Sequence, residues 1–181
     1  MSTRNIIVAS LASALLAACA TSDPGPSPTP TQGPNLGATP SAAMLAAMDI
    51  SIPPSGAGLP AGGADARAGA KVYAAKCASC HGPKGEGKPA DRLVGGIGTL
   101  TKERIRTVGS YWPYATTLFD YTRRAMPTTQ PMSLTNEEAY GVTAYLLALN
   151  GIIKEDEVMN AQSLPKVRMP NRDGFIDYSN K

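Results

Sequence analysis

Residues 77–81 read Cys77-Ala78-Ser79-Cys80-His81, and this stretch decides which fold and which cofactor the rest of the chain supports. Two cysteines three positions apart, followed at once by a histidine, form the pattern that attaches haem c through two thioether bonds, with the histidine beneath the iron. A zinc site would need two further ligands, and the chain has only one other cysteine and no other histidine. A thioredoxin-type redox pair would need a strand and a helix around the motif, and no such pattern surrounds it. The stretch therefore predicts one covalent haem c, held by Cys77 and Cys80.

His81 is the only histidine in the chain, which limits how the iron can be ligated. A second histidine ligand cannot come from the same chain, so the sixth position is filled by methionine, by a less usual side chain, or by nothing. Four of the seven methionines follow the motif: Met126, Met132, Met159 and Met169. An iron with both axial positions filled suits electron transfer. An open position would instead suit a haem enzyme or a gas sensor, which usually also needs a distal acid or base.

The first residues of the chain have the pattern of an export signal. Arg4 precedes an apolar run from Ile6 to Ala18 that is too short to span a bilayer. Leu16-Ala17-Ala18-Cys19 is similar to the bacterial lipobox, which implies a lipid on Cys19 and, with Ala20 next, the outer membrane. The alternative is a plain signal peptide and a protein free in the periplasm. We expect a signal peptide over 1–18 and a protein anchored on the periplasmic side of a membrane.

Composition divides the rest of the chain in two. Residues 19–44 are rich in Pro, Ser, Thr and Gly, which predicts a disordered tether attached to the lipid. Residues 45–181 are predicted to form one mono-haem domain, with extended arms over 45–63 and 152–181. The formal net charge is +3, and removal of the signal peptide takes away only Arg4. This nearly neutral balance gives no reason to expect a nucleic-acid partner.

Helical signals recur three times in the domain. The expected helices cover residues 65–77, 112–126 and 135–150. Asp65 has the position of an N-cap, Pro113 suits a first helical position, and Thr135 with Glu138 has the form of a capping box. The segments between the helices are expected to be a glycine-rich loop around the haem, 82–98, and a short helical turn, 104–108.

The order of these features resembles that of the class I cytochromes c. A first helix that runs into CxxCH, a glycine-rich loop, a tryptophan before a middle helix, a Met-Pro pair and a last helix with an aromatic residue are typical of the family. The resemblance implies a mainly α-helical domain of about three to four helices around one haem c. It also implies that Gly69 and Tyr73 meet Tyr145 where the first and last helices cross.

The same resemblance implies roles for further residues. Met126, at a helix end and followed by proline, has the family's placement for the sixth iron ligand opposite His81. Met132, in the same loop, is the main alternative, and Met169, before another proline, is a further one. The resemblance also implies that the indole N–H of Trp112 reaches a haem propionate, although a lone tryptophan is equally an ordinary core residue.

Three more side chains are candidates for the haem pocket or its propionates: Tyr114, Arg92 and Arg124. For the two arginines, a plain surface position is the other interpretation. The chain departs from the family at the proline whose backbone carbonyl orients the haem histidine. Pro89 lies four residues before Leu93 instead of the usual two, so its role toward His81 is left open.

A narrower resemblance is to the cytochrome subunits of bacterial sulfite and sulfur dehydrogenases. The segments that carry it are 109–121, 124–127, 144–151 and 164–175. It implies an electron-transfer protein, not itself an enzyme, that accepts electrons from a periplasmic molybdenum dehydrogenase and passes them to a terminal oxidase or another cytochrome. The cytochrome of sulfur dehydrogenases often carries two haems, whereas this chain has one CxxCH. A general membrane-tethered carrier that serves several donors is the alternative.

Overall fold

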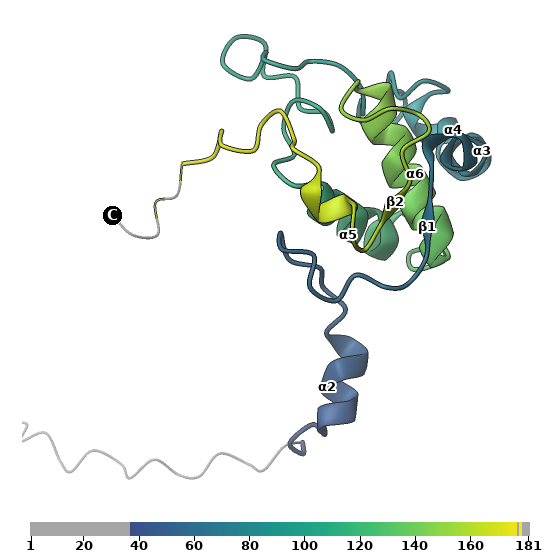
Figure 1. Cartoon of the computed structure of the whole chain (residues 1–181), viewed down its shortest axis with the longest axis vertical. Helices are drawn as coiled ribbons and strands as arrows, with labels where there is room; N and C mark the ends of the chain where they lie inside the picture. The colour runs from purple at the N-terminus through teal and green to yellow at the C-terminus, as the bar shows by residue number, and fades with distance from the viewer. Residues whose placement is uncertain (1–36, 177, 179–181) are drawn as a thin grey trace, which may run out of the picture. The chain divides into compact units, whose positions relative to one another are not determined.

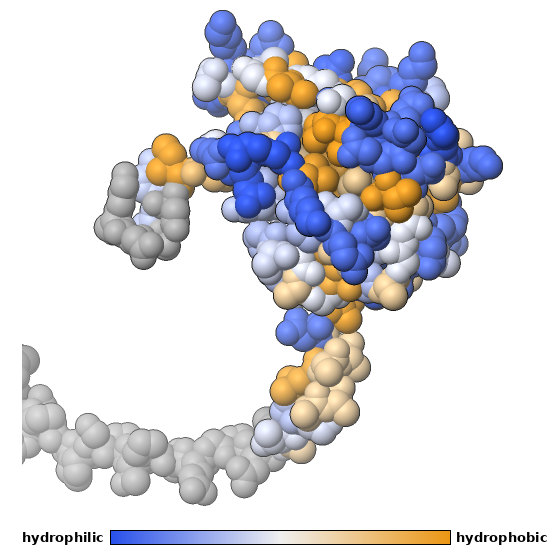
Figure 2. Space-filling model, viewed as in Figure 1, coloured by the Kyte–Doolittle hydropathy of each residue, from blue (hydrophilic) through white to orange (hydrophobic). Residues whose placement is uncertain are grey.

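The computed structural model describes residues 37–176 and 178. The expected signal peptide, Cys19 and most of the expected tether lie outside these residues. The chain divides into two units between Leu45 and Ala46. Helix α2, Ala42–Met48, lies across this boundary and none of its residues is buried, so the last residues of the expected tether are helical. Figure 2 shows the apolar surface of this helix. Within the described part of the chain, every helix is too short or too polar to cross a membrane.

The second unit is built mainly from helices (Figure 1). Its helices are α3 Ala66–Lys76, α4 Ala78–His81, α5 Ala115–Ala125, α6 Asn136–Leu149 and the 3-10 turn η1 Leu164–Lys166. Two short strands, β1 Gly63–Ala64 and β2 Met159–Asn160, pair antiparallel, with Gly63 opposite Asn160 and Ala64 opposite Met159. The mainly helical prediction is confirmed. The strands were not expected, because two residues are too few to produce a strand pattern in a sequence.

The crossing of α3 and α6 forms the centre of the domain. Gly69 on α3 faces Gly141 on α6 so closely that a Cβ added to Gly69 would lie 1.8 Å from the carbonyl oxygen of Gly141. Beside this contact the rings of Tyr73 and Tyr145 pack with centroids 5.1 Å apart. The expected meeting of Tyr73 with Tyr145 is therefore confirmed, and the backbone partner of Gly69 is Gly141.

The expected caps begin both crossing helices. Asp65 Oδ1 accepts a hydrogen bond from the backbone N–H of Ala68 at 2.8 Å. The hydroxyl of Thr135 accepts from the N–H of Glu138 at 3.2 Å, and the carboxylate of Glu138 accepts from the N–H of Thr135 at 3.0 Å. Each bond satisfies an N–H group that the first turn of a helix leaves without a partner.

Two expectations for the middle of the chain are wrong. Helix α5 begins at Ala115 because Tyr114 is its extended N-cap, so Pro113 precedes the helix and is not its first residue. The short helical turn expected over 104–108 is absent, although all these residues are described. There the hydroxyls of Thr107 and Ser110 bond to nearby backbone groups, and such local bonds compete with a helix.

Both extended arms supply buried side chains to the domain. In the first arm Ile52 is buried, and its N–H donates to the carboxylate of Asp120 on α5 at 3.0 Å. In the second arm Leu164 and Met169 are almost fully buried in the core. The carboxyl-terminal arm was expected to lie over the body of the domain, and it also forms part of the core.

Candidate functional site

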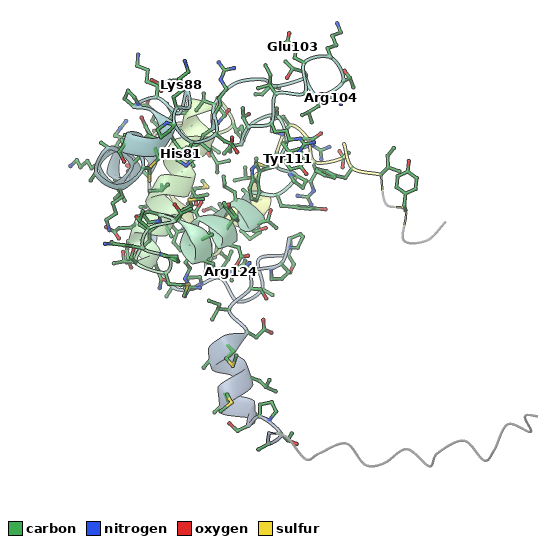
Figure 3. All side chains as sticks on the ribbon, turned by 180° about the vertical axis from the view of Figure 1, so that it is seen from behind. His81, Lys88, Glu103, Arg104, Tyr111 and Arg124 are labelled. Carbon is green, nitrogen blue, oxygen red and sulfur yellow. The ribbon has the colours of Figure 1, made fainter. Side chains whose placement is uncertain are left out.

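A short helical turn carries Cys77, Cys80 and His81. Helix α3 ends at Lys76, and Cys77 serves as its C-cap and as the N-cap of α4. The N–H groups of Cys80 and His81 both donate to the carbonyl oxygen of Cys77, at 3.1 and 3.0 Å. Cys77 is half-buried, Cys80 is exposed, and both are free thiols. Residues three and four apart share one helix face, so the turn presents two cysteine sulfurs and an imidazole together. Figure 3 labels His81 on this turn.

The imidazole of His81 is oriented by one backbone carbonyl. Its Nδ1 lies 2.7 Å from the carbonyl oxygen of Asp91. Because a carbonyl only accepts, the proton is on Nδ1, and Nε2 has a lone pair available for a metal. Asp91 is two residues before Leu93, so the carbonyl comes from the expected backbone position, but Asp91 and not Pro89 occupies it. The spacing to Leu93 was the signal in the sequence that could have identified Asp91.

The glycine-rich loop brings Asp91 to the imidazole. The N–H of Gly87 donates to the carbonyl of His81 at 2.8 Å, and the N–H of Ala90 donates to that of Cys80 at 2.9 Å. Gly87 has a φ of 93°, which a residue with a side chain adopts with difficulty. Residues 82–98, all of them described, contain no helix or strand, so the expected loop is confirmed.

Burial keeps two ionisable groups of this region neutral, the hydroxyl of Tyr73 and the thiol of Cys77. The buried Tyr73 hydroxyl donates to the carbonyl oxygen of Gly82 at 2.9 Å, and burial raises the pKa of Tyr73 to about 12. Burial also raises the pKa of the Cys77 thiol to about 11. Catalytic redox cysteines have a lowered pKa, because the thiolate is the reactive form. The environment of Cys77 is thus the opposite of that in a disulfide oxidoreductase.

The methionines after the motif fall into two groups. Met159 and Met169 are buried in the core, where protein atoms already enclose their side chains on every side. Met126 is half-buried and is the C-cap of α5. Met132 lies in the following loop and is 50% exposed. Met126 and Met132 therefore keep an open side for a further ligand contact, and Met169 does not.

Three of the expected pocket residues lie in loops. Trp112 is half-buried and packs against Tyr121 with ring centroids 5.6 Å apart. Tyr114 is half-buried, and the guanidinium of Arg172 lies 4.4 Å from its ring centroid. Arg92 is exposed and follows Asp91, the residue that orients the imidazole. Trp112 also packs against the hydrophobic core, so it is a core residue whether or not its indole N–H contacts a propionate.

Arg124, the fourth expected pocket residue, is held by Asp120. Its Nε donates to Asp120 Oδ1 at 2.9 Å, and its Nη2 donates to Asp120 Oδ2. These bonds raise the pKa of Arg124 above its usual value. Asp120 also accepts from the N–H of Ile52, so one buried carboxylate joins α5 to the first arm. Only the remaining N–H groups of Arg124 are available to a haem carboxylate. The role of Asp120 was not identified from the sequence.

Comparisons with known proteins cover this whole region. The family model described as cytochrome c oxidase, cbb3-type, subunit III, matches residues 64–146, which include the CxxCH turn, helix α5 and all but the last three residues of helix α6. A chain in the crystal structure of the sulfane dehydrogenase SoxCD from Paracoccus pantotrophus is 37% identical, with a TM-score of 0.74. The match covers 81% of this chain and 74% of that chain. A search of curated proteins finds no match.

Proposed function

The chain belongs to the class I cytochrome c family and carries haem c, and on this premise we propose that it receives electrons from a dehydrogenase of sulfite or another sulfur compound. The single observation that carries this proposal is the 37% identity to a chain of a sulfane dehydrogenase over 81% of this chain. The matched portion exceeds residues 64–146, so it includes segments beyond the family's shared domain. The chain then passes the electrons toward the respiratory chain and performs no oxidation of substrate itself.

We assign the covalent attachment of the haem to Cys77 and Cys80 and one axial position to His81. Haem c supplies a carrier of one electron at a time. Cys77 is the N-cap of α4 and Cys80 lies within it, and neither sulfur is part of a disulfide, so both can form a thioether bond. The carbonyl of Asp91 keeps the proton of His81 on Nδ1, so that Nε2 would be the neutral donor to the iron.

We assign the other axial position to Met126. It ends α5, is followed by Pro127, and keeps an open side, whereas the buried Met169 does not. Met132 is the alternative, because it also keeps an open side. A methionine in this position raises the reduction potential relative to histidine and leaves no position for a substrate. We further assign propionate contacts to the indole N–H of Trp112 and to Arg92.

We also propose that the protein is held on the periplasmic side of a membrane by a lipid on Cys19. The support is the sequence Leu16-Ala17-Ala18-Cys19, with Ala20 favouring the outer membrane. The tether and the first arm then connect the anchor to the cytochrome domain. Metabolic labelling with a radioactive fatty acid is expected to label the wild-type chain and to leave Cys19→Ala unlabelled.

The experiment that tests the partner is stopped-flow reduction of the purified holoprotein. The reductant is sulfite together with a purified molybdenum dehydrogenase that oxidises sulfite. We expect the bimolecular rate to exceed the rate with an unrelated dehydrogenase at least tenfold. Equal rates would remove the sulfur-compound dehydrogenase from the proposal and support a general carrier, while electron transfer as such would stand.

A further inference from the structure

Five side chains form one surface where the loop before α5 meets the carboxyl-terminal arm. We call it the arginine–aromatic surface, and it consists of Arg106, Tyr111, Tyr114, Arg172 and Phe175. The guanidinium of Arg106 lies 5.4 Å from the ring centroid of Tyr111, and that of Arg172 lies 4.4 Å from the centroid of Tyr114. Tyr111 also meets Phe175 edge to face at 5.3 Å. Figure 3 shows Tyr111 beside the carboxyl-terminal arm.

The arm that carries half of this surface is fixed to the domain. Met169 is buried in the core, and its carbonyl accepts from the N–H of Arg172 at 3.1 Å. The side-chain amide of Asn171 donates to the carbonyl of Tyr111 at 2.8 Å. A Cβ on Gly174 would lie 1.9 Å from Asn171 Oδ1, so the arm turns tightly here. The arginine–aromatic surface is thus formed before any partner binds, which lowers the entropy cost of docking.

The surface combines exposed aromatic rings with two guanidinium groups that form no ion pair with a described side chain. Tyr111 is 36% exposed and Phe175 is 52% exposed. Neither Arg106 nor Arg172 makes an ion pair with any residue that the structure describes. The segments 102–106 and 166–175 together contain six basic and two acidic side chains. These two segments therefore carry a formal charge of +4, against +3 for the whole chain, so the excess positive charge of the chain lies in the two segments that supply Arg106 and Arg172.

We propose that the arginine–aromatic surface docks a carboxylate-rich face of the electron-donating dehydrogenase, an inference that rests on the proposed function. Tyrosine, phenylalanine and arginine are the residues enriched in protein interfaces and their energetic centres. A guanidinium whose carbon lies over a ring keeps N–H groups for a carboxylate, which arginine binds in a fork. Opposite charge also steers the encounter and raises its rate. Tyr111 precedes Trp112 in the sequence, and if Trp112 contacts a propionate as we assign, a donor docked here would lie near that side of the haem.

An anionic membrane is the other surface that could attract these charges. Membranes are recognised mainly by clusters of flexible basic side chains and by aliphatic groups that insert among the lipids. Here both guanidiniums are held against rings, and the aromatic side chains pack on one another. This ordered arrangement fits a complementary protein face better than a fluid layer of headgroups.

The test compares charge-removing variants in the stopped-flow assay with sulfite and the molybdenum dehydrogenase that oxidises it. Arg106→Gln, Arg172→Gln and the double variant remove charge from the surface. Arg67→Gln is the matched control, because Arg67 is exposed on α3 and makes no ion pair with a described residue. At low ionic strength we expect each surface variant to slow reduction roughly threefold and the double variant about tenfold. The control should keep at least two thirds of the wild-type rate. All rates should converge at high salt.

Three further measurements make the result decisive. Reduction by ascorbate should be equal in all variants, which shows that the haem site is intact. Arg172→Lys, which keeps the charge but loses the planar fork, should fall between wild type and Arg172→Gln. Sedimentation with vesicles of phosphatidylglycerol and phosphatidylethanolamine, using the Cys19→Ala chain, should show no difference between wild type and the double variant.

Each contrary outcome has one meaning. If the dehydrogenase reduces wild type quickly but the surface variants match Arg67→Gln, the docking surface is wrong and the proposed function stands. If vesicle binding is lost in the double variant while enzymatic reduction is unchanged, the surface faces the membrane and our assignment is overturned. If wild type is reduced no faster than by an unrelated dehydrogenase, both the partner and its docking surface are refuted.

Discussion

Replacing Gly69 with alanine is expected to destabilise the domain, although alanine is the better helix former. The new Cβ would lie 1.8 Å from the carbonyl oxygen and 2.2 Å from the carbonyl carbon of Gly141. An ordinary carbon–oxygen contact between helices is about 3.3 Å, so α3 and α6 must separate by roughly 1.5 Å. Both sides of the contact are backbone, so no side-chain rotation relieves it. The overpacking belongs at the upper end of the usual range, about 3 kcal/mol.

Helix propensity offsets part of this cost. Alanine in a helix interior is better than glycine by about 1 kcal/mol, so the net loss for Gly69→Ala is about 2 kcal/mol. Gly141→Ala is the matched control, because its Cβ would meet Gly69 atoms only at 3.0 and 3.1 Å. A shift of a few tenths of an ångström accommodates it, and it gains the same propensity. We expect Gly141→Ala to stay within about 1 kcal/mol of wild type.

The assay is guanidinium chloride unfolding of the holoproteins, followed by circular dichroism at 222 nm. Thermal unfolding should show Tm lowered by roughly 6 °C in Gly69→Ala for a domain of this size. The packing of Tyr73 on Tyr145 lies beside the crossing, so near-ultraviolet dichroism should change as well. A Gly69→Ala protein as stable as Gly141→Ala would show that α3 and α6 do not meet backbone to backbone at Gly69.

Three other predictions concern the haem ligand, the first arm and the capping box. Met126→Ala should lose the methionine–iron charge-transfer band near the red end of the oxidised spectrum, and its reduction potential should fall. Met132→Ala should keep the band and the wild-type potential. The reverse result would make Met132 the ligand. Asp120→Asn should lower the free energy of unfolding by about 1–2 kcal/mol in denaturant titrations, because it weakens the bonds to Arg124 and the first arm; an unchanged midpoint would show that the arm is not held there. The hydrogen bond from Lys76, and after it the one from the N–H of Thr135, lower the pKa of Glu138 in the folded state. The ionised carboxylate of Glu138 therefore contributes its full stabilisation of the fold above the unfolded pKa of about 4.3. This contribution disappears as the pH falls through the folded pKa. Glu138→Gln should therefore lose less stability than wild type between neutral pH and pH 3, and parallel curves would refute this.

Features written in a few neighbouring residues were predictable from the sequence. The cap at Asp65 and the capping box of Thr135 with Glu138 each join atoms three residues apart. The glycine-rich loop follows from backbone conformations that other residues adopt with difficulty. Such signals depend on local chemistry alone, so the rest of the fold does not need to be known.

Contacts between distant segments were not predictable. The bond from Ile52 to Asp120 joins residues 68 positions apart, and an aspartate on a helix is more often a solvated charge. The pairing of β1 with β2 involves two residues on each side, too few for a strand pattern. Leu164 and Met169 are isolated apolar residues in a segment rich in proline and polar groups. Their burial depends on where the preceding helices leave space.

Asp91 shows that the position of a residue in the sequence can identify which backbone carbonyl acts where the residue type does not. The task at this position is to present a carbonyl oxygen to Nδ1 of His81, and every residue has a backbone carbonyl. A proline would help by fixing the backbone, but here hydrogen bonds from Gly87 and Ala90 to the CxxCH turn hold the loop instead. The residue type therefore pointed to Pro89, whereas the spacing of two residues to Leu93 pointed to Asp91, which supplies the carbonyl. In a loop whose role is carried by the backbone, spacing to a fixed residue is the better guide to which position acts.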